Sequence, residues 1–560
     1  MTTNNKFQTA LQINTTQIPW KFRESQYILN FSINGCIQYI KDGQIQKIEK
    51  QCYTSSSIIR NLEQLKYLTW HGQFGIENQR IGRWRAYWRG EGLNIGGYYD
   101  DKGKKQGIWI ELFENYWDKC QVTYKGEYQN GCKRGIWSTF YMVQKIGGGL
   151  YNENELKHGK WIDLHENFNN TLQVIYYGEY LNGRKIGIWN INSQKKLYGI
   201  GYYDENGNKN GKWITMSFYN LESGQSIEAG QYKNDKKVGR WNVIQNNNLI
   251  GGGVYDENGI KKGMWIELDQ NDSKVGEYIN GNKVGMWDII FRNSITGGGQ
   301  YNEQGEKQGK WMELNENYNS YCQVIYVGEY ERGIRISKWK TIFEKKMIGE
   351  GQYNSLGMKQ GLWVDLHDNF DYFCQVVHVG KYLDNQRYGQ WQTFQLNMDM
   401  IIGGGLYDEN GMKNGYWIDL FENYQDGCQI VYIGQYKNGL KYGKWITQAN
   451  NQFNAEEIGG GCYDNDGQKQ GKWIEIHENC SGYYYIILVG EYKDGIKQGR
   501  WRIQYKETDG YFYKTIGGGQ YNEIGLKNGN WIELDNKFTE DQIIVHSCEY
   551  QLGKQILGLK

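Results

Sequence analysis

The stretch from Gly405 to Trp417 reads GLYDENGMKNGYW, and it recurs along the chain with small changes. In this long motif a tryptophan follows the tyrosine by ten residues, and the tyrosine stands at positions 99, 151, 203, 255, 301, 353, 407, 463 and 521. A short motif, such as GEYINGNKVGMW from Gly276 to Trp287, lies between the copies, with its tyrosine at 128, 180, 232, 278, 330, 382, 436, 492 and 550. A repeat of this length is typical of an array in which each unit buries its apolar face against its neighbours.

Each pair of motifs predicts four strands. In the fifth pair, Gly297 to Asn302 and Gly309 to Asn315 are expected to be extended, and Cys322 to Tyr330 alternates in polarity as a half-buried strand does. A fourth strand is expected after a turn near Gly333. Because no helical pattern separates the strands, the predicted fold is all-β: an elongated, single-layer antiparallel β-meander of eighteen tandem hairpins, hence about 36 strands in a rod-like ribbon.

Two regions are predicted. Residues 1–70 form an N-terminal cap with a mobile tail to about residue 20, three short strands between Tyr27 and Ile48, and a short helix after Ser55. This cap is expected to cover the first edge of the sheet. Residues 71–560 form the array, which begins with an imperfect copy containing Phe74.

Charge and cysteine content exclude several classes of function. The 64 basic and 63 acidic residues nearly cancel, so the chain has no overall field that would attract nucleic acid. No run approaches the roughly 20 apolar residues of a membrane span, and we expect a cytoplasmic protein. Four cysteines at equivalent positions are expected to be small buried hydrophobes in a reducing compartment: Cys120, Cys322, Cys374 and Cys428. No C-x-x-C pair suggests a metal.

The repeated aromatic residues predict a structural spine, since packing is the commonest use of a repeated aromatic residue. The glycine two residues before each tryptophan, such as Gly309, and the triple glycines ahead of the tyrosine are expected to let the ring lie over neighbouring backbone. The spine consists of Trp109, Trp161, Trp213, Trp265, Trp311, Trp363, Trp417, Trp473 and Trp531.

A base stands four residues before every one of these tryptophans. This candidate partner-binding stripe consists of Lys105, Lys157, Lys209, Lys261, Lys307, Lys359, Lys413, Lys469 and Lys527. The short motif has its own base, Lys or Arg, and a carboxylate follows each long-motif tryptophan by two residues except at Thr215. Two interpretations stay open: local ion pairs of under about 1 kcal/mol each, or an array of bases matched to an acidic partner. In the second case, charge reversal of Lys307, Lys359 and Lys413 should weaken binding with little effect on stability.

Catalytic groupings are not expected. His165, His367 and His477 share one repeat position, where Phe113, Phe421 and Asn315 stand in other copies, so we interpret it as a tolerant surface or edge site. They lie more than 50 residues apart, too far to share a proton or a metal. The sequence therefore predicts a protein that is not an enzyme, with no catalytic residue, no cofactor and no metal site.

The short motif, for example YGEYLNGRKIG from Tyr177 to Gly187, resembles the MORN repeat (membrane occupation and recognition nexus), and the long motif resembles its variant form. The resemblance covers residues 72–560 and is typical of long protist arrays. It implies an elongated antiparallel sheet and a scaffold for protein partners in a cytoskeletal or ciliary assembly. The alternative that it implies is a peripheral membrane module that binds acidic phospholipid through the Lys/Arg stripe. The chain departs from well-known members because no kinase or methyltransferase domain accompanies the repeats.

Overall fold

The computed structural model describes residues 8–14, 24–31, 36–41, 44–50, 62–76, 79–193, 196–217, 226–269, 272–425, 427–450, 455–477, 484–507, 512–534 and 545–559. The N-terminal region contains β1 (Gln8–Asn14), β2 (Glu24–Phe31), β3 (Cys36–Lys41), β4 (Gln44–Lys50) and α1 (Leu62–Tyr67). Within the described ranges, no helix is long and apolar enough to span a bilayer.

The array is built of β5 to β42, and each strand pairs antiparallel with the next in sequence. Its first third comprises β5 (Leu68–Phe74), β6 (Arg80–Trp88), β7 (Glu91–Tyr99), β8 (Lys105–Leu112), β9 (Val122–Gln129), β10 (Cys132–Tyr141), β11 (Gln144–Tyr151), β12 (Lys157–Leu164), β13 (Val174–Leu181), β14 (Arg184–Ser193), β15 (Lys196–Tyr203), β16 (Lys209–Ser217), β17 (Ser226–Lys233) and β18 (Lys236–Gln245). The middle comprises β19 (Asn248–Tyr255), β20 (Lys261–Leu268), β21 (Ser273–Ile279), β22 (Asn282–Phe291), β23 (Ser294–Tyr301), β24 (Lys307–Leu314), β25 (Val324–Glu331), β26 (Ile334–Phe343), β27 (Lys346–Tyr353), β28 (Lys359–Leu366), β29 (Val376–Leu383) and β30 (Gln386–Gln395). The last part comprises β31 (Met400–Tyr407), β32 (Lys413–Leu420), β33 (Ile430–Lys437), β34 (Leu440–Asn450), β35 (Ala455–Tyr463), β36 (Lys469–Ile476), β37 (Tyr484–Lys493), β38 (Ile496–Glu507), β39 (Lys514–Tyr521), β40 (Lys527–Leu534), β41 (Val545–Gln551) and β42 (Lys554–Leu559).

This architecture confirms the predicted all-β antiparallel meander. In the fifth pair, β23 to β26 match the four predicted strands to within a few residues. The turn between β23 and β24 forms because the Asn302 side chain accepts hydrogen bonds from the backbone N–H of Gln304 (3.1 Å) and Glu306 (2.9 Å). An aspartate or asparagine follows the tyrosine in every long motif, so the sequence favours the same turn in all nine copies.

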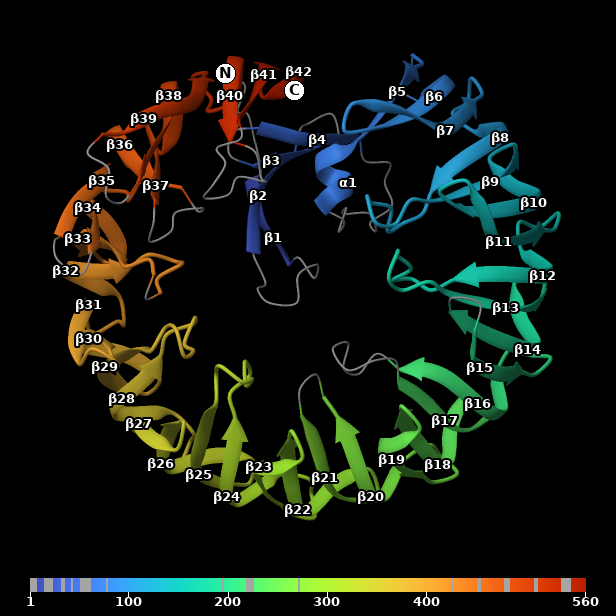
Figure 1. The fold of residues 1–560 in the computed structure, drawn as a ribbon, viewed down its shortest axis with the longest axis horizontal. Coiled ribbons are helices and arrows are strands. Elements are labelled where there is room, and N and C mark those ends of the chain that lie inside the picture. The colour runs from blue at the N-terminus through green and yellow to red at the C-terminus, as the bar shows by residue number, and fades with distance from the viewer. Residues whose placement is uncertain are drawn as a thin grey trace.

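The sheet curls, and the expected rod shape needs correction. Figure 1 shows the array bending round into a nearly complete ring, with the connections of many hairpins pointing inward. Register shifts recur in three of the four strand pairs of most periods, for example at Ile289/Ile290, at Gly299/Gln300 and at Val327/Glu329. Because a bulge bends a strand and the same bulges recur in each repeat, the bends add up along the sheet.

The N-terminal strands lie between the two ends of the array. β2, β3 and β4 are the three predicted strands, while β1 lies where a tail was expected. Helix α1 contacts β5, and β4 contacts β42, so this region touches the last strand as well as the first (Figure 1). The predicted cap over Ser55 to Ser57 lies outside the described residues.

Candidate functional site

The nine long-motif tryptophans lie in a continuous buried row. Their exposed fractions range from 1% to 7%. Their rings alternate edge to face with tyrosines, as in Tyr301–Trp311 (5.0 Å between centroids) and Trp311–Tyr330 (6.0 Å). The indole nitrogen of Trp311 donates to the Gln300 backbone oxygen at 3.0 Å. Each ring thus satisfies its polar atom on the neighbouring strand while its body packs in the row.

Two glycines serve each tryptophan, but only one of them makes room for the ring, so the prediction is confirmed only in part. A side chain at Gly299 would put a Cβ 2.4 Å from Trp311, so the third glycine of the GGG run lies under the ring. Gly309, two residues before the tryptophan, faces open space and has φ +68°. Its role is conformational, because side chains rarely adopt that backbone region.

The predicted lysine stripe lies on top of this row. The ammonium groups sit 4.3–5.1 Å from the centres of the tryptophan rings. Eight of the nine pair with the carboxylate two residues after the tryptophan, at 2.6 Å in Lys157–Asp163 and 2.7 Å in Lys359–Asp365. Lys209 differs because Thr215 stands in place of its carboxylate.

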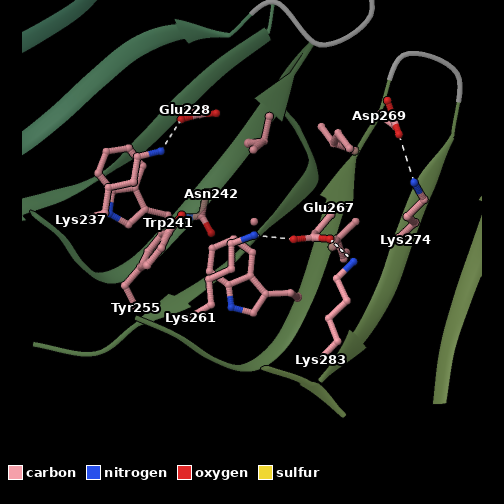
Figure 2. A pocket seen from close by; sticks show the side chains of 15 residues that line it. Glu228, Lys237, Trp241, Asn242, Tyr255, Lys261, Glu267, Asp269, Lys274 and Lys283 are labelled. Atoms are coloured by element: carbon pink, nitrogen blue, oxygen red, sulfur yellow. Dashed lines mark hydrogen bonds and ion pairs between the residues drawn. The ribbon is translucent and has the colours of Figure 1, made fainter. Parts of the chain in front are cut away.

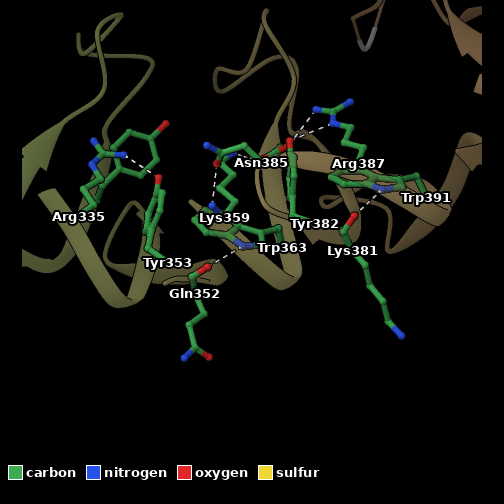
Figure 3. Close-up of polar contacts among 12 residues, drawn as sticks. Arg335, Gln352, Tyr353, Lys359, Trp363, Lys381, Tyr382, Asn385, Arg387 and Trp391 are labelled. Atoms are coloured by element: carbon green, nitrogen blue, oxygen red, sulfur yellow. Dashed lines mark hydrogen bonds and ion pairs between the residues drawn. The ribbon is translucent and has the colours of Figure 1, made fainter. Parts of the chain in front are cut away.

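Each carboxylate has further donors, and Figure 3 labels the three side chains that contact Asp365, namely Lys359, Tyr382 and Arg387. Tyr382 donates to Asp365 at 2.6 Å, and Arg387 from the following short motif forms a 2.9 Å ion pair with it. Arg387 also lies 4.3 Å above the Trp391 ring. Burial raises the pKa of Asp365, but Lys359, Tyr382 and Arg387 outweigh it and hold the pKa below its ordinary value.

This network changes the interpretation of the stripe. Lys307 pairs with Glu313 and Lys413 with Asp419, so their charges are used inside the repeat rather than offered outward. These ion pairs argue against the expectation that reversing Lys307, Lys359 and Lys413 would have little effect on stability. Each reversal would place two carboxylates together over an aromatic ring.

The exceptional repeat keeps a carboxylate by moving it across strands. Thr215 on β16 pairs in register with Glu228 on β17, where other repeats have Tyr124 or Tyr176. Glu228 forms a 2.8 Å ion pair with Lys237. Thr215 and Glu228 therefore compensate one another. Within the long motif alone, the sequence shows only that the carboxylate is missing at Thr215.

A pocket of about 320 Å³ opens beside this repeat (Figure 2). Four lysines line it, and each lies in an ion pair: Lys237 with Glu228, Lys261 and Lys283 with Glu267, and Lys274 with Asp269. Trp241, Tyr255 and Trp265 also contribute to its wall. The pocket combines amines and carboxylates with aromatic rings, which suits a small polar group.

The pocket lies where one connection is short. Only residues 269–272 join β20 to β21, whereas residues 315–323 join β24 to β25. The longer connection brings Cys322 into a buried cluster with Val324, Phe343 and Phe370. At the pocket the residue paired with Glu267 is Lys274, while Tyr326 pairs with Glu313 in the longer repeat.

Cysteines and histidines of the connections are mostly interior. The four equivalent cysteines are buried and unbridged, as predicted, and burial raises the pKa of Cys322 to about 11. His165 is buried, so the expected surface or edge site is wrong for that copy. His367 Nδ1 lies 3.3 Å from His378 Nε2, a pair that the repeat spacing did not reveal.

Comparisons with known proteins add little. No family model matches the chain, and no curated protein matches it. Among solved structures, the Tc holotoxin pore of Photorhabdus luminescens matches with a TM-score of 0.15 and 10% identity over 99% of this chain and 34% of that chain. The TcdB2–TccC3 structure gives a TM-score of 0.15 and 10% identity over 99% of this chain and 35% of that chain. This chain spans about a third of those chains, and such low TM-scores support no inference about function.

Proposed function

We propose that the protein is a non-enzymatic scaffold that holds protein partners along its sheet, in a cytoplasmic cytoskeletal or ciliary assembly. The MORN-like motifs favour this role. So does the pairing of the stripe lysines with carboxylates of the same repeat, because it leaves few of these charges available for an acidic partner. The observation that carries the proposal is a row of exposed apolar side chains on the face opposite the tryptophans.

The row arises from the strand period. The residue just before each tryptophan points to the other face, and Ile108, Ile136 and Ile188 are 61%, 71% and 59% exposed there. Cross-strand neighbours extend the row, since Ile136 pairs with Leu150 and Ile188 with Tyr202. Exposed apolar side chains thus recur along this face, with Lys160 between Ile136 and Ile188, and clusters of such side chains are typical of a protein-binding surface.

The test uses substitutions that the array already tolerates. Lysine stands at the same position in two repeats of this region, Lys160 and Lys212. The triple variant Ile108→Lys, Ile136→Lys and Ile188→Lys should therefore fold with an unchanged thermal midpoint. We expect the full chain to sediment with taxol-stabilised microtubules or axonemes, and the variant to bind at least about tenfold more weakly.

The matched control is Lys160→Gln with Lys212→Gln, which alters the same row without changing its apolar residues. Its binding should equal that of the original chain. A full chain that stays in the supernatant, or a triple variant that sediments as well as the original, contradicts the proposal.

The peripheral membrane alternative predicts binding to vesicles of acidic phospholipid that is lost at high salt. The internal ion pairs of the stripe argue against it, because eight of its nine lysines already have carboxylate partners. Flotation of the full chain with vesicles of phosphatidylserine separates the two: salt-sensitive flotation supports the alternative.

A further inference from the structure

The last hairpin departs from the eight other short motifs at two positions, and a third residue close to them is shared with one other copy. Cys548 stands two residues before the short-motif tyrosine, where the eight other copies have glycine. His546 stands where four copies have tyrosine and one has His378, and Gln555 stands where the eight others have lysine or arginine.

The cysteine fits because a tryptophan is missing. In the preceding short motif, a Cβ added at Gly490 would lie 2.2 Å from the Trp501 ring, which excludes any side chain. The corresponding residue after Cys548 is Leu559, eleven positions on, instead of a tryptophan. Cys548 is 4% exposed.

Three side chains with metal-binding atoms converge here from two strands. Glu533 on β40 pairs in register with His546 on β41, and Trp531 with Cys548. The carboxylate oxygen, ring nitrogen and sulfur of Glu533, His546 and Cys548 all lie within 4.8 Å of one another.

The contacts of Glu533 leave one oxygen directed toward the histidine. Lys527 pairs with Oε1 at 2.5 Å, and Tyr550 donates to Oε2 at 2.9 Å. His546 Nε2 lies 3.7 Å from Oε2. Gln555 Nε2 lies 3.2 Å from the Cys548 sulfur.

Charge supplies the second argument. In other repeats a second cation, from the short motif, pairs with the equivalent carboxylate: Lys283 with Glu267 at 2.7 Å, and Lys497 with Glu475 at 2.9 Å. In the last repeat that base is the neutral Gln555. Glu533 therefore pairs with Lys527 but lacks the second base that the short motif supplies in those repeats.

We propose that Glu533, His546 and Cys548 bind a divalent transition metal, with zinc as the best match, in the place of the second cation. Zinc accepts oxygen, nitrogen and sulfur ligands together, and three protein ligands leave a fourth position for water or a partner group. The metal joins β40 to β41 at the end of the array. The expected absence of metal rested on C-x-x-C spacing, which a set assembled across two strands does not need.

Cobalt(II) titration of the full, reduced chain tests the site. We expect one equivalent to bind with a thiolate-to-cobalt absorption band, and zinc to displace it. Cys548→Gly and His546→Tyr restore the residues of other repeats, so both should fold. We expect the band to disappear in Cys548→Gly and the affinity to fall by more than about 100-fold in either variant.

A third variant separates the charge argument from ligand loss. Gln555→Lys restores the second cation without touching a proposed ligand, and should lower cobalt affinity by about tenfold or more. Cys462→Ser removes an exposed cysteine elsewhere and should change nothing. A full chain without the band, a Cys548→Gly variant that keeps it, or unchanged affinity in Gln555→Lys overturns the proposal.

Discussion

The repeat around Trp311 and the repeat around Trp265 share one ladder but differ in what covers it. Both place a lysine over the tryptophan, at 4.6 Å, and both pair that lysine with a glutamate. Around Trp311 a nine-residue connection, 315–323, supplies a buried apolar cluster, whereas around Trp265 four residues, 269–272, leave a pocket. The motifs thus fix the lysine, tryptophan and carboxylate arrangement. The length of the connection goes with whether the sheet beside that arrangement is covered by an apolar cluster or exposed in a pocket.

The largest expected difference lies in the apolar cluster. Phe343 is 5% exposed and packs on Phe370 at 5.2 Å, so Phe343→Ala should cost about 3–5 kcal/mol. Its equivalent one repeat earlier, Phe291, packs on Tyr318 at 4.9 Å but is only half-buried, and Phe291→Ala should cost less than half as much. Urea unfolding of both variants measures this, and equal losses would show that the deeper burial of Phe343 adds no stability.

The second largest loss of stability is expected when a carboxylate that pairs with the lysines and arginines is neutralised. Asp365→Asn leaves Lys359 and Arg387 together without their carboxylate, and should cost about 2–3 kcal/mol. Glu228→Gln should cost about 1 kcal/mol, because Glu228 pairs with Lys237 alone among the bases. Thermal midpoints should rank the two variants in this order, and the reverse order would contradict the shared-carboxylate network.

Acid should weaken the covered region more than the pocket. His378 pairs across strands with Asp365, and burial first, then the nearby cations, lower its pKa to about 4. The groups that act on it are His367, Arg387 and Lys413, which lower the pKa, and Asp365, which raises it.

In the unfolded chain a histidine titrates near about 6.5, so the unfolded chain binds this proton first as pH falls. His378 therefore contributes no penalty above about pH 6.5, and stability falls between there and pH 4, by about 2 kcal/mol at pH 5. His378→Tyr, the residue at the equivalent Tyr326, should flatten that part of the stability profile. If the His378→Tyr variant has the same profile of stability against pH as the original chain, groups other than His378 cause the acid sensitivity.

Much of the fold could be predicted because the motifs carry it locally. The turn at Asn302, the strand alternation from Val324 and the burial of Trp311 all follow from residues within one repeat. The ring could not be predicted, because small bends at bulges such as Gly299/Gln300 add up only when strand registers are known. Neither could the Thr215–Glu228 exchange, which joins residues thirteen positions apart on two strands.

The candidate site was predicted less well than the fold for the same reason. A base at a fixed distance before each tryptophan indicates a stripe of lysines. Whether those lysines face a partner or an internal ion pair depends on the carboxylate six residues after each lysine. Lys359 and Asp365 stand on one strand with an even separation, so their side chains share a face. That parity was visible in the sequence and favours an internal pair.

The smallest expected effect comes from closing the pocket. Lys274→Tyr puts beside Glu267 the residue that Tyr326 supplies beside Glu313. The ring would cover part of the open wall, and the lost ion pair with Asp269 is partly exposed, so we expect a net gain of under about 1 kcal/mol. Lys274→Gln removes the same charge without a ring and should give no gain. A Tyr variant that is no more stable than the Gln variant would mean that the short connection, rather than the residue opposite Glu267, holds the pocket open.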